Sequence, residues 1–102
     1  MLELRPNCEC CDKDLPPESM EARICTYECT FCAQCVDGLL QNVCPNCGGG
    51  FVPRPIRPQV ERRPRTCLAK QPASTKRVIT KYSRDELKEF SSAFKHIAAE
   101  DR

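Results

Sequence analysis

The chain has 102 residues and a formal net charge of +2, so it is expected to form one domain with attached segments. Ten cysteines, nine prolines and no tryptophan leave few large apolar side chains for a core, and a bound metal or disulfides should therefore support the fold. No apolar run is long enough to span a membrane, and no basic and apolar leader opens the sequence. These absences predict a cytoplasmic protein with no membrane partner, in which cysteine pairs favour metal binding over disulfides.

Charge divides the chain into three parts, because the net charge is −5 over residues 1–50, +8 over 51–82 and −1 over 83–102. Nine of the ten cysteines fall in the first part and most prolines in the second. The expected domains are therefore a zinc-binding head at 1–52, a basic proline-rich tether at 53–81 and an amphipathic helix at 82–102.

Eight cysteines of the head form four closely spaced pairs, with Cys10 left over. A C-x-x-C loop directs two sulfurs to one point, and Zn²⁺ binds four thiolates tetrahedrally with no position left for a substrate. In the stretch CPNCGGG, Pro45 fixes φ and Gly48 can take the left-handed conformation that follows such a loop. The pattern predicts two Zn²⁺ ions held by Cys8, Cys11, Cys25, Cys29, Cys32, Cys35, Cys44 and Cys47.

The spacing leaves the order of pairing open. Consecutive pairing would place the first two pairs on one ion and the last two on the other. Alternating pairing would join the first pair to the third and the second pair to the fourth. Cys10 is either a small buried side chain or an alternative ligand to Cys8.

Other uses of the thiols are less favoured. The run Cys29-x2-Cys32-x2-Cys35 is typical of an iron–sulfur ferredoxin, but the next spacing is eight residues rather than three. A thiol redox sensor or enzyme using Cys10 would lack the usual βαβ setting of a C-x-x-C motif. Hydrolysis would need an open metal position and a nearby base, whereas His96 is the sole histidine and lies in the C-terminal segment. We therefore expect no enzymatic activity.

The fold class expected for the head is a small zinc-stabilised α+β domain. Alternating apolar residues predict a short strand around Met20–Ile24, and a helix is expected near Val36–Asn42. The apolar side chains expected to form a minor core are Leu2, Leu4, Leu15, Ile24, Phe31, Leu39, Leu40 and Val43.

The tether has five prolines between residues 53 and 72, which favour an extended, polyproline-like chain. It is expected to be a solvated linker or to fold back on the acidic head, and Cys67 is expected to be a free thiol. Nucleic-acid binding is an alternative, although no aromatic residue lies among the arginines for base stacking. The basic residues available for phosphate contacts are Arg54, Arg57, Arg62, Arg63, Arg65, Lys70, Lys76 and Arg77.

The C-terminal segment begins with a capping box, in which Ser83 is the N-cap and Glu86 follows three residues later. Tyr82 before the cap and Leu87 in the first turn form a hydrophobic staple. His96 lies roughly opposite the apolar face. That face should pack on the head, on a second copy or on a client protein, since a lone helix of this length is marginal in water. It is made of Leu87, Phe90, Phe94, Ile97 and Ala98.

The stretch ICTYECTFCAQCVDGLLQNVCPNCGG resembles the second half of a RING finger, with Phe31 before the fifth ligand and a C-P-x-C knuckle at the end. RING fingers are cross-braced, so the resemblance implies a RING-like, treble-clef-like head and the alternating order of pairing. Cys29 stands where most RING fingers carry histidine. RING ubiquitin ligases commonly carry an aliphatic residue where this chain has Cys10 and a basic residue where it has Gly48, so ligase activity is not expected.

The stretches LELRPNCECCDKDLPP, ARIC, CTFC, CPNCGG and PAST also occur together in a small bacterial family of cysteine-rich proteins of unknown function. Residues 1 to about 80 resemble that family closely, and the resemblance implies no known activity. The sequence as a whole predicts a non-enzymatic, zinc-binding protein-interaction module, with nucleic-acid binding through the tether as the alternative.

Overall fold

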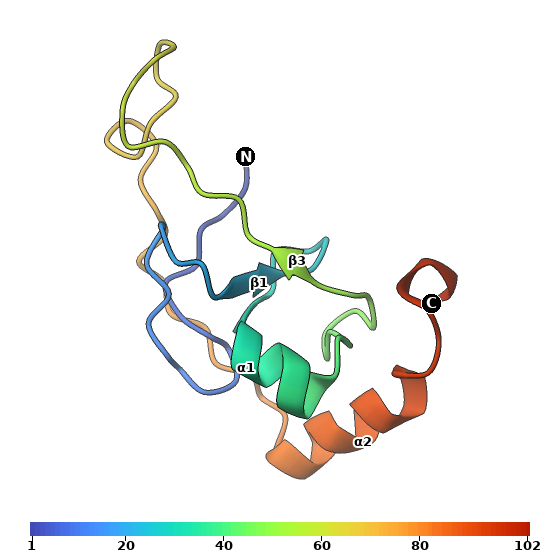
Figure 1. The fold of residues 1–102 in the computed structure, drawn as a ribbon. Helices are drawn as coiled ribbons and strands as arrows, with labels where there is room; N and C mark the ends of the chain where they lie inside the picture. The colour runs from blue at the N-terminus through green and yellow to red at the C-terminus, as the bar shows by residue number, and fades with distance from the viewer.

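A three-stranded antiparallel sheet in the order β2-β1-β3 lies at the centre of the head in the computed structural model, which describes residues 1–102 (Figure 1). The sheet and the helices confirm the α+β class. The strands are β1 (Ala22–Ile24), β2 (Thr30–Cys32) and β3 (Val52–Pro53). Ile24 of β1 lies opposite Thr30 of β2 and Val52 of β3. Only β1 falls within the stretch predicted as a strand, because strands of three and two residues show too little alternation to be recognised.

The helix of the head follows β2 without a loop. It starts as α1 (Ala33–Cys35) and continues as the π-helical segment η1 (Val36–Leu40). It therefore begins three residues before the predicted start, and the C-x-x-C pair of Cys32 and Cys35 spans its first turn. Gln41 and Asn42 end it, because both take left-handed backbone conformations with φ of 48° and 60°.

Cysteines make up nearly half of the core, because five of its eleven buried residues are cysteines. Phe31 is fully buried, and its ring packs edge-on against Phe51 with centroids 5.4 Å apart. Six residues of the expected minor core are buried, whereas Leu2 and Leu39 are only partly covered. Only 21 of the 102 residues are buried, so apolar burial alone gives this fold limited stability.

The tether folds back on the head instead of extending into solvent. After β3 it contains no further strand or helix until α2, and it projects as a long loop before returning along the head (Figure 1). On the return, the Ser74 amide donates to the Leu4 carbonyl at 3.0 Å and the Thr80 amide donates to the Glu9 carbonyl at 2.7 Å. The proline-rich segment is thus attached to the head at both ends.

Two arginines hold the start of the tether. The Arg54 guanidinium is 4% exposed and donates to the carbonyls of Arg5, Leu15 and Pro16 at 2.8, 3.3 and 3.0 Å. Its burial lowers the pKa of Arg54, and its Nε atom has no hydrogen-bond partner. Arg57 donates to the carbonyls of Leu2 and Gln71, each at 2.7 Å.

The C-terminal helix α2 (Arg84–Phe94) begins with the predicted capping box. The Glu86 amide donates to Ser83 Oγ at 3.1 Å, and the Ser83 amide donates to Glu86 Oε1 at 2.9 Å. The hydrogen bond from the Ser83 amide, with a further contribution from the Ser83 side chain, lowers the pKa of Glu86. Leu87 is buried in the core of the head with Tyr82 packed beside it, and α2 lies against η1 (Figure 1). The helix therefore docks on its own chain.

The helix is shorter than the predicted segment, because it ends at Phe94 and a 3₁₀ turn, η2 (Ala99–Asp101), follows. Ala98 between them is extended, with ψ of 145°. Arg102 holds this C-terminal turn in place by donating hydrogen bonds to the carbonyls of Ile97 and Asn42 at 3.0 and 2.6 Å. None of the helices is long and apolar enough to cross a membrane.

Candidate metal centre

The first and third cysteine pairs meet at one point. We call Cys8, Cys11, Cys32 and Cys35 the first cluster, and their sulfurs all lie within 4.8 Å of one another. The Sγ atoms of Cys11 and Cys32 are 3.8 Å apart. Four thiolates bound tetrahedrally to one ion at about 2.3 Å would lie about 3.8 Å from each other. The first cluster thus has the size that a tetrahedral metal site requires.

Three separate elements supply these sulfurs. Cys8 and Cys11 lie in a tight loop that the bridge between Asn7 and Asp14 closes. Cys32 ends β2, and Cys35 ends α1. In the loop, the Cys11 amide donates to Cys8 Sγ at 3.5 Å, as in a metal knuckle. The sheet and the helix therefore fix half of the cluster, and the loop must be held against them.

Two buried polar residues that the sequence did not single out hold this loop. The Glu9 carboxylate accepts from the Thr30 amide at 2.7 Å and from Arg5 Nη1 at 2.8 Å, which ties the loop to β2. The Asn7 side chain donates to the Cys8 carbonyl at 3.1 Å and to the Val78 carbonyl at 2.8 Å, which ties it to the tether. Their position on either side of Cys8 in the stretch LRPNCECC was the only sequence signal for this role.

The second and fourth pairs form a second cluster through Cys25, Cys44 and Cys47, whose sulfurs also lie within 4.8 Å of one another. The Tyr27 amide donates to Cys25 Sγ at 3.3 Å, and the Gly49 amide donates to Cys47 Sγ at 3.4 Å. Gly48 has φ of +77°, the left-handed conformation expected after the C-P-N-C loop. These contacts place the same knuckle geometry at a second site.

The remaining cysteines lie outside both clusters. Cys29 is buried beside Cys25, and the Cys25 amide donates to its carbonyl at 3.2 Å, but its sulfur is not within the second cluster. Cys10 is half-buried against the core, and Cys8 rather than Cys10 belongs to the first cluster. Cys67 is buried in the tether. All ten cysteines are free thiols in the structure.

The clusters follow the alternating order of pairing and not the consecutive one, because Cys8 and Cys11 meet Cys32 and Cys35 rather than Cys25 and Cys29. Each cluster therefore joins segments that are far apart in the sequence. The chain passes from the first cluster to the second and back before it reaches the last knuckle. Loss of either cluster would therefore loosen segments that also carry cysteines of the other cluster.

The electrostatics of the metal-free clusters oppose ionisation. Burial raises the pKa of Cys8 to about 11, and burial together with neighbouring sulfurs raises the pKa of Cys35 and Cys44. Burial also acts against ionisation of Cys11, but hydrogen bonds from the Lys13 amide and from neighbouring thiols lower its pKa. Packed thiols of this kind need a bound cation before they can ionise together.

The basic residues considered for phosphate contacts separate into two groups. Arg54 and Arg57 donate to backbone carbonyls, and Arg77 forms ion pairs with Asp12 and Asp14, each at 2.8 Å. The hydrogen bonds that Arg77 donates to Asp12 and Asp14 raise the pKa of Arg77. The other basic residues of this group are exposed and make no ion pair: Arg62, Arg63, Arg65, Lys70 and Lys76.

The fold and the two clusters define a small cysteine-rich α+β protein with two sites able to hold metal ions. The chain belongs to the family described as "Protein of unknown function (DUF1272)", which matches residues 1–57. It is 60% identical over 79 residues to an uncharacterized protein, R02474, of Rhizobium meliloti (strain 1021), a match that covers 78% of this chain and 87% of that protein. The resemblance to a cysteine-rich bacterial family is therefore confirmed. No solved structure matches the chain.

Proposed function

We propose that the chain is a non-enzymatic, cytoplasmic protein-interaction module whose head is held together by two structural Zn²⁺ ions. The observation that carries this proposal is the alternating arrangement of the two thiol clusters. Such an arrangement joins the N-terminal loop, the sheet, α1 and the last knuckle through metal ions in a chain that buries few apolar residues. It gives the ions a role in folding.

Zinc fits these donors better than other common ions do. Thiolates select soft or borderline metals, and Zn²⁺ takes four of them in a tetrahedral site without any redox change. Cys29 is the expected fourth ligand of the second site, because it is buried and its carbonyl accepts a hydrogen bond from the amide of Cys25, which belongs to that site. A structural site with four protein ligands is closed to substrate.

Two residues that could act as an acid or a base, Glu9 and His96, are not placed for catalysis at the clusters. The Glu9 carboxylate, which lies next to the first cluster in sequence, already accepts hydrogen bonds from the Thr30 amide and Arg5. His96 is exposed beyond the end of α2 and belongs to neither cluster. These positions support a structural role for the metal.

The surface most suited to a partner lies on α2. Phe90 and Phe94 are 36% and 37% exposed, and their ring centroids are 4.9 Å apart. Leu87 from the same predicted face is already buried in the head, and Ile97 lies beyond the helix end. A client protein that binds through these rings should be lost on Phe94→Ala, and its affinity should vary less with salt than nucleic-acid binding would.

Native mass spectrometry of protein purified under reducing conditions tests the metal assignment. We expect two Zn²⁺ per chain, and Cys10→Ser should keep both because Cys10 lies outside the clusters. One Zn²⁺ would reject the second site. Iron with sulfide, or paired disulfides without metal, would reject the proposal as a whole.

Nucleic-acid binding through the tether is a second candidate, favoured by the exposure of Arg62, Arg63 and Arg65 on one projecting loop. Fluorescence anisotropy with labelled single and double strands would test it over a range of salt concentrations. Each phosphate contact should contribute a slope of about −0.9 in the logarithmic salt dependence, and Arg63→Gln should reduce the slope by about one contact. An affinity independent of salt would reject this function.

A further inference from the structure

A slot lies between α2 and the last knuckle of the head. Its volume is about 380 Å³, within the range of about 300–1,000 Å³ that is usual for ligand pockets. The side chains that α2 and Tyr82 contribute include two aromatic rings and two carboxylates. The full lining is Pro45, Tyr82, Glu86, Leu87, Glu89, Phe90 and Ala93.

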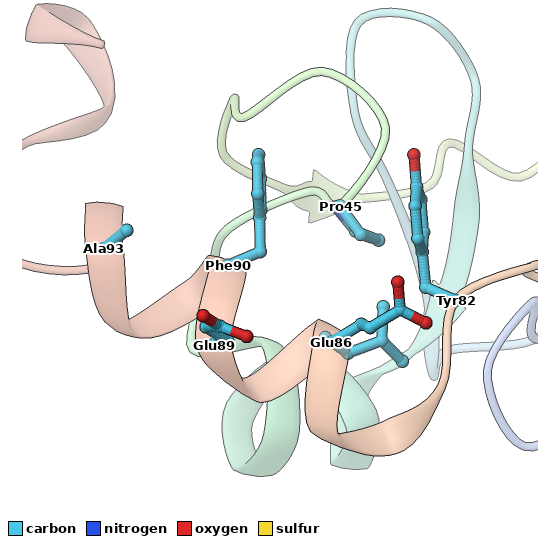
Figure 2. Close-up of a pocket in the computed structure, with 7 residues that line it drawn as sticks. Pro45, Tyr82, Glu86, Glu89, Phe90 and Ala93 are labelled. Atoms are coloured by element: carbon cyan, nitrogen blue, oxygen red, sulfur yellow. The ribbon is translucent and has the colours of Figure 1, made fainter.

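Figure 2 shows how these side chains are arranged. The rings of Phe90 and Tyr82 stand on opposite sides of the slot with Pro45 between and behind them, and the Glu86 carboxylate lies at the foot of the slot, beside the base of the Tyr82 side chain. One oxygen of Glu86 accepts the Ser83 amide, and the other makes no hydrogen bond with the protein. Glu89 lies exposed along the same edge.

This set of side chains suits a cation. The face of an aromatic ring attracts a positive charge, and a guanidinium can stack on a ring while it donates to a carboxylate. No lysine or arginine lines the slot. Lys81 lies over the Tyr82 ring with Nζ 5.5 Å from the centroid, but it is outside the lining. An arginine side chain is therefore the ligand that fits both the rings and the carboxylates.

The same chain carries exposed arginines in the tip loop, residues 58–66. Every residue of this loop is exposed, including Arg62, Arg63 and Arg65, and its one acidic residue, Glu61, accepts a hydrogen bond from the Arg65 amide. The projecting loop and α2 lie at opposite ends of the molecule, whose longest dimension is 45 Å (Figure 1). The loop cannot reach the slot of its own chain.

We propose that the slot of one chain binds an arginine of the tip loop of a second copy. The opposite net charges of the head and the tether favour this head-to-tail contact over one that pairs like surfaces. Because the two surfaces differ, a complex of two chains still has one free slot and one free loop, so association continues until a ring closes or concentration limits it. The proposal gives a partner to the interaction role proposed above and rests on it.

Sedimentation velocity on the full, metal-loaded chain tests the proposal. At low salt the sedimentation coefficient should rise with concentration between about 10 μM and about 1 mM, and this rise should shrink at about 0.5 M salt.

The slot variant is Glu89→Lys, with Glu100→Lys as its control. The loop variant combines Arg62→Glu, Arg63→Glu and Arg65→Glu, with Lys70→Glu and Lys76→Glu together as its control. Each test variant should weaken association at least tenfold, and the controls should not.

Mixing the two test variants gives the sharpest result. The slot variant keeps a working loop and the loop variant keeps a working slot, so an equimolar mixture should form a heterodimer and nothing larger. A symmetric dimer through Phe90 and Phe94 would not depend on the loop and would reject the proposal. A chain that stays monomeric at every concentration would also reject it.

Metal content measured on the same samples separates this proposal from the metal-binding role. Two Zn²⁺ on a strict monomer would overturn self-association and leave the structural metal sites standing. An assembly with no metal, which still dissociates in the slot and loop variants, would overturn the metal role and support the slot.

Discussion

The Sγ atoms of Cys11 and Cys32 lie 3.8 Å apart although 21 residues separate them. This contact joins the N-terminal loop to the end of β2, and the second cluster then joins the turn between β1 and β2 to the last knuckle. Both clusters therefore take a cysteine from the same hairpin, Cys32 in the first cluster and Cys25 in the second. Metal binding at the two sites should therefore be coupled, and the head should fold as one unit.

Replacing a ligand of the first cluster should unfold the head. Structural Zn²⁺ contributes about 10–16 kcal/mol of folding free energy in small zinc domains, whereas the total stability of a domain is about 5–15 kcal/mol. Cys32→Ser should therefore remove metal from both sites and abolish the dispersed amide signals in a heteronuclear NMR spectrum. Cys10→Ser is the matched control and should keep both the signals and the metal. A folded Cys32→Ser protein with two ions would show that Cys32 is not a ligand.

Metal affinity should rise with pH. Without metal, burial holds the pKa of Cys8 at about 11 and also raises the pKa of Cys35, so both thiols keep their protons at neutral pH. The metal-bound state holds fewer protons than the metal-free state, so acid favours release of the ion. Because Cys8 and Cys35 must each lose a proton on binding, the logarithm of the affinity of the first site should rise by at least about two per pH unit between about pH 6 and 8. Competition with a chelator measures this slope, and a value near zero would contradict thiolate ligation.

Arg54 should matter for stability and not for nucleic-acid affinity. Arg54→Ala leaves three carbonyl acceptors without their buried donor, which should cost about 3 kcal/mol in the free energy of unfolding. The exposed Arg62→Ala should change it by less than about 0.5 kcal/mol. Urea unfolding of the metal-loaded chain compares the two. Equal effects would mean that Arg54 does not attach the tether to the head.

The features that sequence reasoning predicted are local. The cysteine pairs are set by three- or four-residue spacings, and the capping box of α2 needs only Ser83 and Glu86, so both could be recognised without knowledge of the fold. Gly48 likewise takes its left-handed conformation within one knuckle.

The features that it missed depend on contacts between distant segments. Asn7 donates to the carbonyl of Val78, 71 residues away, and Arg54 donates to Leu15, 39 residues away. Neither partner is a side chain, so no pattern of residue types marks the bond. The end of α2 at Phe94 was also missed. The segment after it is held by a hydrogen bond from Arg102 to the Asn42 carbonyl, and the helical spacing of the apolar residues does not indicate that bond. The alternating order of pairing came from a resemblance and not from the spacing.

Leu87 should control the docking of α2 without affecting the metal sites. Its side chain is 3% exposed and packs in the core of the head, so Leu87→Ala should cost about 2–4 kcal/mol of local stability. An isolated helix of 11 residues is marginal in water, so the loss should speed amide hydrogen exchange throughout α2. Exchange in β1 and β2 should stay slow, and both metal ions should remain bound. Phe94→Ala on the exposed face is the matched control and should leave exchange in α2 close to that of the unaltered chain. Faster exchange in the sheet as well would show that α2 is part of the same folding unit as the metal-bound head.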